Sequence, residues 1–274
     1  MHLDRRRFIT SLAAAPAVAA ITERPAGKVE IAFDSPAKSK PNGLQATQQG
    51  LWIMDQSQGS RVFLVRFEDG KVLRSFETEA DRASGITFDG EALWLASTYN
   101  RLIIRADAAT GKTLAKHYTP GSGPIYRMTG DPPARSSPLA PSKPAPRPAE
   151  SNVISEPPGG TAGTGAHGLE WRDGKLWMAV PPSRSIFRLD PKTWIVDRKF
   201  TTAANRPHGI GWEGSYLWAT DSNLNAFFKH NVETGAMMEK IQLSDRDPLP
   251  HGMSIWQGVL WYCDDVGVVC KLKL

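Results

Sequence analysis

The dipeptide Leu-Trp occurs five times in this chain, and each time a glycine stands eight residues before the leucine. The leucines are Leu51, Leu93, Leu176, Leu217 and Leu260, and the glycines are Gly43, Gly85, Gly168, Gly209 and Gly252. Successive glycines are 42, 83, 41 and 43 residues apart, so the long interval is close to two periods. A period near 42 residues with strand-like segments is typical of β-propeller blades.

Each repeat unit predicts four antiparallel strands. A short apolar run follows the glycine, then a tight turn such as Asp173-Gly174, then the Leu-Trp strand, and two further strand-like segments. Glycine in the turn supplies the positive φ that a two-residue hairpin requires. Adjacent Leu and Trp side chains point to opposite faces of a strand, so both faces of the unit are apolar. A single unit cannot bury both faces, and we therefore expect the units to close into a ring.

The two ends of the chain suggest how the ring closes. The last unit ends with its third strand, Val268–Leu274, whereas Lys28–Phe33 stands before the first unit and resembles the fourth strands elsewhere. We expect Val29–Phe33 to pair with Val268–Leu272, which removes an exposed sheet edge. The sequence thus predicts an all-β fold in residues 21–274, a single propeller domain of five four-stranded antiparallel blades closed by an N-terminal strand.

The 83-residue interval contains an insertion. Residues 120–160 hold 11 of the 21 prolines, and proline cannot donate to a sheet ladder. This composition predicts a mostly disordered insertion, with a decayed sixth blade as the alternative. Its first part, Ile125–Met128, is less biased, and Tyr126 and Arg127 are candidate ligand-binding residues over the propeller mouth. A linker without function is the other interpretation.

The first twenty residues have the features of an export signal. Arg5, Arg6 and Arg7 precede a short apolar stretch and an Ala-x-Ala cleavage site. The order Arg-Arg-x-Phe-Ile resembles the bacterial twin-arginine signal, which implies export of a folded protein to the periplasm or beyond. An ordinary secretory signal is the alternative. The apolar stretch is too short for a stable membrane span.

Charge and cysteine content constrain the partners. Removal of residues 1–20 takes away three arginines and one aspartate, which lowers the formal net charge from +5 to +3. No basic block remains that would favour nucleic acid or an anionic membrane, and we expect a monomer that binds a small molecule or peptide. Cys263 and Cys270 flank one hairpin, in which Cys263 should lie opposite Val268, so the geometry argues against a disulfide.

The candidate chemistry lies immediately before the repeat glycines. These positions hold Asn42, Ser84, His167, His208 and His251, and each begins the innermost strand of a blade. The innermost strands line the central channel of a propeller, so the five side chains should form a ring around one channel mouth. Three imidazoles that converge on one axis suit a divalent metal such as zinc or magnesium, with His167, His208 and His251 as ligands. They suit general acid/base catalysis equally well. A structural histidine inherited by duplication is the third interpretation.

Two of these segments resemble a known enzyme family. Pro207-His208-Gly209-Ile210 and Pro250-His251-Gly252-Met253, each followed by a Leu-Trp strand that ends in Asp221 or Asp264, look like blades of the virginiamycin B (streptogramin) lyase family. The resemblance covers residues 43–119 and 166–274. It implies His208 and His251 as acid/base residues, Asp264 as their acidic partner, a magnesium ion, and opening of a cyclic depsipeptide by elimination. Asp221 would be a second acceptor or an oxygen ligand.

The chain departs from that family in several respects. The family has seven blades, its acidic residue is usually Glu, and its strand motif is Trp-Phe-Thr-Glu, where this chain has Trp-Tyr-Cys-Asp264. Secreted glutamine cyclotransferases offer a second resemblance, whereas a quinoprotein is less apt because no adjacent cysteine pair exists. We expect no nucleotide or PQQ cofactor. Two functions stay open: an exported metal-assisted lyase, and a non-catalytic platform that binds a peptide, sugar or protein on the same face.

Overall fold

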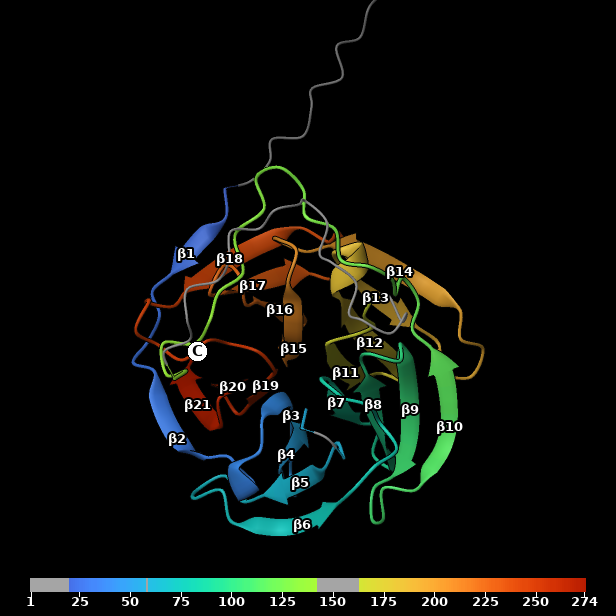
Figure 1. Ribbon diagram of the computed structural model, residues 1–274. Helices are drawn as coiled ribbons and strands as arrows, with labels where there is room; N and C mark the ends of the chain where they lie inside the picture. The colour runs from blue at the N-terminus through green and yellow to red at the C-terminus, as the bar shows by residue number, and fades with distance from the viewer. Residues whose placement is uncertain (1–19, 58, 142–162) are drawn as a thin grey trace, which may run out of the picture.

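The computed structural model describes residues 20–57, 59–141 and 163–274. They form five antiparallel sheets around a central axis (Figure 1). The first blade comprises β3 (Pro41–Thr47), β4 (Gly50–Asp55), β5 (Val62–Val65) and β6 (Val72–Phe76), and the second comprises β7 (Ile86–Phe88), β8 (Ala92–Ser97), β9 (Leu102–Asp107) and β10 (Thr113–Tyr118). The third blade comprises β11 (Gly168–Arg172), β12 (Lys175–Val180), β13 (Ser185–Leu189) and β14 (Val196–Thr201), and the fourth comprises β15 (Pro207–Glu213), β16 (Tyr216–Asp221), β17 (Ala226–Asn231) and β18 (Met237–Gln242). The fifth blade comprises β19 (Met253–Trp256), β20 (Val259–Asp264), β21 (Val268–Lys273) and β2 (Glu30–Asp34). The predicted five-bladed β-propeller is confirmed, and the described residues contain no sixth blade.

The ring closes through the N-terminal strand. Strand β2 pairs antiparallel with β21, with Ile31 opposite Cys270 and Asp34 opposite Val268. The predicted closure is therefore confirmed. A further strand, β1 (Thr22–Arg24), pairs in parallel with the outer strand β18 and adds a fifth strand to the fourth blade. The sequence did not predict β1, because three polar residues show no strand periodicity.

The Leu-Trp pairs build the interfaces between blades. All five leucines are fully buried, and the tryptophans are at most 6% exposed. Leu51 packs in a cluster with residues of the fifth blade, whereas Trp52 packs in a cluster with residues of the second. The same alternation recurs around the ring, so the apolar core is divided into five clusters, one between each pair of neighbouring blades.

The repeat glycines lie where the innermost strands come closest. A Cβ atom at Gly43 would be 2.0 Å from the carbonyl oxygen of Ser84, and one at Gly209 would be 2.1 Å from the backbone nitrogen of Met253. Only a residue without a side chain fits such an approach. The five glycines surround a space of about 150 Å³ in which no part is wide enough for a water molecule. The channel is therefore constricted at the glycines, and the ring of Asn42, Ser84 and the three histidines stands directly beside this constriction.

The first part of the insertion makes defined contacts. Residues 120–141 contain no strand, but Asp131 binds Arg184 with a shortest N···O distance of 2.6 Å, and Gly123 forms an isolated bridge with Thr164. We call residues 131–139 the strap. The composition did not predict these contacts, and residues 142–162 lie outside the described part of the chain.

Both cysteines are buried and free. Cys263 lies opposite Val269 and Cys270 opposite Tyr262. The register differs by one residue from the expected pairing of Cys263 with Val268, but it supports the argument against a disulfide.

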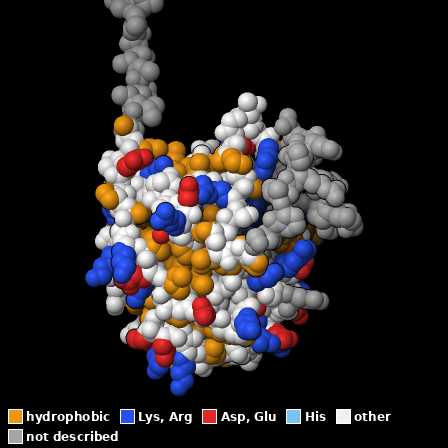
Figure 2. Space-filling model, turned by 60° about the vertical axis from the view of Figure 1, so that its left-hand side comes forward, with side chains coloured by type: hydrophobic (Ala, Val, Ile, Leu, Met, Phe, Trp, Pro, Cys, Tyr) orange, Lys and Arg blue, Asp and Glu red, His pale blue; other side chains and the backbone are white. Residues whose placement is uncertain are grey.

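The outer surface carries mixed charges. Figure 2 shows basic and acidic side chains interspersed with apolar ones on the face turned toward the viewer. Within residues 20–57, 59–141 and 163–274, no helix is long and apolar enough to cross a membrane. The predicted export signal, apart from Ala20, lies outside the described residues.

Candidate functional site

The five residues before the repeat glycines are all buried at the channel. Their exposed fractions are 2% for Asn42, 0% for Ser84, 3% for His167, 1% for His208 and 6% for His251. Hydrogen bonds to the second strand of the same blade hold the backbone there, as between His167 N and Ala179 O (2.9 Å) and between His251 N and Cys263 O (2.9 Å).

Two ring residues stand at irregularities in the strand pairing. The register between the first two strands shifts between Pro41 and Gly43 in the first blade and between Pro207 and Ile210 in the fourth. A bulge of this kind turns a side chain out of the regular alternation of a strand. At these shifts stand Asn42 and His208.

The three imidazoles contact one another in a row across neighbouring blades. The ring centroids of His167 and His208 are 4.5 Å apart, those of His208 and His251 are 4.9 Å apart, and the ring planes cross at 73° and 86°. Edge-to-face contact at this separation is favourable for aromatic rings. The structure thus brings together the three histidines selected from the sequence.

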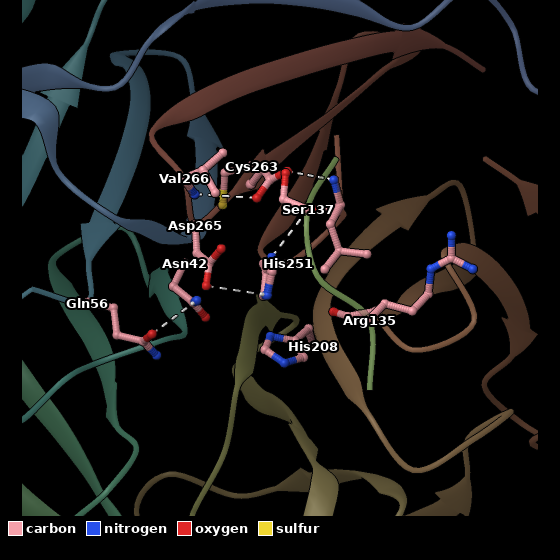
Figure 3. Close-up of polar contacts among 12 residues, drawn as sticks. Asn42, Gln56, Arg135, Ser137, His208, His251, Cys263, Asp265 and Val266 are labelled. Carbon is pink, nitrogen blue, oxygen red and sulfur yellow. Dashed lines mark hydrogen bonds and ion pairs between the residues drawn. The ribbon is translucent and has the colours of Figure 1, made fainter. Parts of the chain in front are cut away.

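The other half of the circle is polar and uncharged. Gln56 links the remaining two ring residues: its Oε1 accepts from Asn42 Nδ2 at 3.4 Å, and its Nε2 donates to Ser84 Oγ at 3.0 Å. Figure 3 shows Asn42 and Asp265 beside the ring of His251, with His208 next to it.

Burial sets the protonation states. Desolvation holds the pKa values of His167 and His208 well below the ordinary 6.5, and the charge of Arg206 lowers both further. Burial also lowers the pKa of His251, but the nearby carboxylates of Asp265 and Asp264 oppose this shift. Neutral imidazoles at neutral pH can accept or donate one proton each.

Each histidine uses one ring nitrogen on a protein partner. Nε2 of His167 is 2.8 Å from Thr164 Oγ1, and Nε2 of His208 accepts from Nε of Arg206 at 3.0 Å. Nδ1 of His251 is 3.3 Å from the carbonyl oxygen of Leu249.

Several buried polar atoms of the ring lack a partner. Nδ1 of His167, Nδ1 of His208 and Oδ1 of Asn42 make no hydrogen bond within the described part of the chain. An unsatisfied buried polar group costs about 1–3 kcal/mol. Unsatisfied polar atoms on three blades at one level of the channel indicate a place where a polar ligand can bind.

The aspartate that ends the Leu-Trp strand hydrogen-bonds to the backbone just before the ring residue. Asp264 accepts from the backbone nitrogen of Leu249 at 2.7 Å, two residues before His251. Asp55 and Asp221 make the equivalent bond, to the nitrogens of Lys40 (2.9 Å) and Arg206 (3.0 Å), each two residues before a ring residue. These aspartates therefore brace the strand that carries the ring residue, and Asp221 does so behind His208.

Asp264 differs from the other two aspartates in its surroundings. The hydroxyl of Ser137, on the strap, donates to its Oδ2 at 2.5 Å. Burial raises the pKa of Asp264, whereas Ser137 and His251 lower it. The predicted acidic partner thus lies near the predicted base, but part of its hydrogen-bonding capacity is already used.

The three-histidine metal site expected from the sequence does not fit this arrangement. A metal requires free nitrogen lone pairs, yet Nε2 of His208 accepts a hydrogen bond from a permanently charged guanidinium. A second set fits better: ligand atoms of His251, Asp264 and Asp265 lie within 4.8 Å of one another. One nitrogen and two carboxylates suit a hard or borderline divalent ion.

Two predicted ligand-binding residues do not join the ring. Tyr126 is 61% exposed, and within the described ranges no hydrogen bond or ion pair links it or Arg127 to the histidines. Sequence reasoning missed Arg206, Gln56 and Asp265. A repeat signal existed for Arg206, because basic residues also stand two positions before the ring residue at Lys40 and Arg82.

Comparisons with known proteins support the propeller fold but do not show a family for this chain. No protein-family model and no curated protein matches the sequence. Glutaminyl cyclase from Myxococcus xanthus is similar in structure, with a TM-score of 0.60 and 11% identity over 93% of this chain and 100% of that one. An inactive variant of virginiamycin B lyase from Staphylococcus aureus, with quinupristin, has a TM-score of 0.48 and 19% identity over 87% of this chain and 67% of that one. At 11% identity the likeness to the glutaminyl cyclase concerns the propeller fold alone.

Proposed function

We propose that this protein is an exported acid/base enzyme of the lyase type, acting on a small molecule or peptide at the histidine-lined channel mouth. His208 and His251 form the acid/base pair, and Asp264 lies beside His251. The observation that carries the proposal is the row of three buried imidazoles in mutual contact, with an unsatisfied Nδ1 on His167 and on His208. The Arg-Arg segment near the N-terminus supports export.

The geometry favours a functional ring over inherited structural histidines. A purely structural histidine would lie in its own blade interface with its nitrogens satisfied, because an unpaired buried group costs free energy. Here the imidazoles lie together at the axis and not in the blade interfaces, and the aspartates hold the backbone before the ring residues instead.

Elimination requires one proton acceptor and one proton donor. The acceptor removes a proton next to a carbonyl group, the C–O bond breaks, and the departing oxygen takes a proton from the donor. Two neutral imidazoles at 4.9 Å can perform both transfers beside the permanently charged guanidinium of Arg206. No water enters the product, which suits a buried site.

A divalent ion would be held by His251, Asp264 and Asp265. When bound, it would polarise the carbonyl oxygen of the substrate. Such an ion would take the lone pair of Nε2 of His251, because Nδ1 faces the carbonyl oxygen of Leu249. The proton transfers proposed for the imidazoles therefore refer to the protein without this ion.

The test compares the wild-type protein with His208→Ala and His251→Ala. Cyclic depsipeptides of the streptogramin B class and peptides with N-terminal glutamine are incubated with each protein, and products are identified by mass spectrometry. Elimination opens the ring at unchanged mass, hydrolysis adds a water, and cyclisation of glutamine releases ammonia. His117→Ala is the matched control, because His117 stacks on Trp194 at 4.1 Å, outside the ring.

The proposal expects ring opening at unchanged mass, abolished in both ring variants and retained in the control. Release of ammonia, lost in the same variants, would replace the lyase by a cyclase. Binding without turnover in the wild type would favour the platform and overturn the enzyme.

A further inference from the structure

Arg206 is held in a fixed position beside the histidine row. Its backbone nitrogen donates to Oδ2 of Asp221 at 3.0 Å, and its carbonyl oxygen accepts from the nitrogen of Ser222 at 3.3 Å. Pro207 follows and fixes its own φ. Both polar groups of the Arg206 backbone therefore form hydrogen bonds. These bonds fix the backbone position from which the half-buried side chain extends.

The side chain determines which nitrogen of His208 carries the proton. Nε of Arg206 lies 3.0 Å from Nε2 of His208. A guanidinium only donates, so Nε2 must accept, and the single proton of the neutral imidazole resides on Nδ1. The positive charge of Arg206 also disfavours a second proton on His208, as does the neighbouring His167.

The equivalent histidine of the fifth blade is held in the opposite way. Nδ1 of His251 lies 3.3 Å from the carbonyl oxygen of Leu249, which only accepts, so Nδ1 carries the proton of the neutral ring. The lone pair is on Nε2, 3.9 Å from Oδ2 of Asp265, and no guanidinium among the described residues hydrogen-bonds to it. His251 is thus free to accept a proton at Nε2, where His208 is not.

The difference between the two histidines comes from one repeat position. The segments Arg206-Pro-His-Gly and Leu249-Pro-His-Gly differ at the residue two places before the histidine. Arginine at that place in the fourth blade can reach the imidazole, whereas leucine in the fifth blade offers only its backbone. Two similar segments thereby acquire different proton chemistry.

We infer that Arg206 is a positioning residue that fixes His208 in the Nδ1-protonated tautomer, so that His208 is the proton donor and His251 the proton acceptor. The two roles rest on the proposed function, whereas the tautomer does not. The unsatisfied Nδ1–H of His208 is the donated proton. Neither the sequence repeat nor the resemblance to lyases gives Arg206 a functional role.

The test reads the tautomer directly. Protein labelled with ¹⁵N in histidine is studied by long-range ¹H–¹⁵N NMR at one neutral pH in metal-free buffer, with His208→Ala used to assign the signals of that ring. We expect a protonated Nδ1 and an unprotonated Nε2 for His208 in the wild type. Arg206→Met should move the proton to Nε2 or mix the tautomers, and Arg206→Lys should restore the wild-type pattern in part. The signals of His251 serve as the internal control.

The activity arm separates this inference from the proposed function. With a substrate found as above, Arg206→Met should lower kcat by at least about tenfold with little change in KM, because a wrong tautomer disables the donor without removing binding contacts. A protonated Nε2 in the wild type, a tautomer unaffected by Arg206→Met, or an unchanged kcat would overturn the positioning role. If His208→Ala leaves turnover intact while the tautomer still depends on Arg206, the proposed function fails. The donor role of His208 and the acceptor role of His251 then fail with it, whereas the effect of Arg206 on the tautomer of His208 stands.

Discussion

Gly168 lies so close to the neighbouring blade that a Cβ atom on it would be 2.0 Å from the carbonyl oxygen of His208. The contact joins the innermost strands of the third and fourth blades at the level of the ring. It explains why the repeat retains glycine: any side chain would force two backbones apart. The same closeness brings His167 and His208, the residues before two of these glycines, into contact, with ring centroids 4.5 Å apart.

Gly168→Ala should therefore destabilise the protein by about 3 kcal/mol, since the obstructing atom belongs to the backbone and cannot rotate away. Chemical denaturation measures the loss. Gly123→Ala is the matched control, because a Cβ atom there would meet nothing within 4 Å. Equal stability of the two variants would contradict the account of the constriction.

Glu170 should make stability dependent on pH. Burial raises its pKa to about 8 from an ordinary value of 4.5, although the backbone nitrogen of Trp171 donates to it at 3.2 Å. The folded state then binds the proton more tightly than the unfolded state, so this contribution is complete below about pH 4.5 and is lost as the pH rises through about 8. Urea midpoints across this range should fall with pH in the wild type and less steeply in Glu170→Gln. Glu91→Gln, which changes an exposed carboxylate, should keep the wild-type slope.

The N-terminal closure predicts a large effect of truncation. Deletion of residues 1–36 removes both β1 and β2 and leaves β21 as an open edge. We expect a loss of several kcal/mol, on the order of 10 °C in Tm. Deletion of residues 1–24 removes β1 alone, which pairs only with an outer strand, and should cost much less. An unchanged Tm after deletion of residues 1–36 would show that β2 does not close the ring.

Ser137→Ala should raise the pKa of Asp264. The hydroxyl of Ser137 lowers this pKa by hydrogen bonding to the carboxylate, so its removal leaves burial less opposed. NMR titration of the Asp264 carboxyl carbon in metal-free buffer measures the shift. Ser136→Ala changes the exposed neighbour and should leave the titration unchanged. An unshifted pKa in Ser137→Ala would show that the strap does not contact the site in solution.

The repeat made most of the fold predictable from the sequence. The period gives the blade, the opposite faces of Leu51 and Trp52 require neighbours on both sides, and the spare strand before Gly43 gives the closure. Because equivalent offsets are related by the rotation between blades, the meeting of His167, His208 and His251 also follows from spacing. Strand β1 was missed, since its pairing depends on the edge that β18 presents.

The tertiary structure decided the chemistry around the ring. Whether Arg206 reaches His208, or Ser137 reaches Asp264, depends on side-chain directions and on the path of an insertion that has no counterpart in the other repeats. Periodicity fixes where the Cα atoms of equivalent residues lie. Hydrogen bonds between particular side chains need atoms placed to within a few tenths of an ångström, and that placement arises only when the ring has closed and its blades have packed.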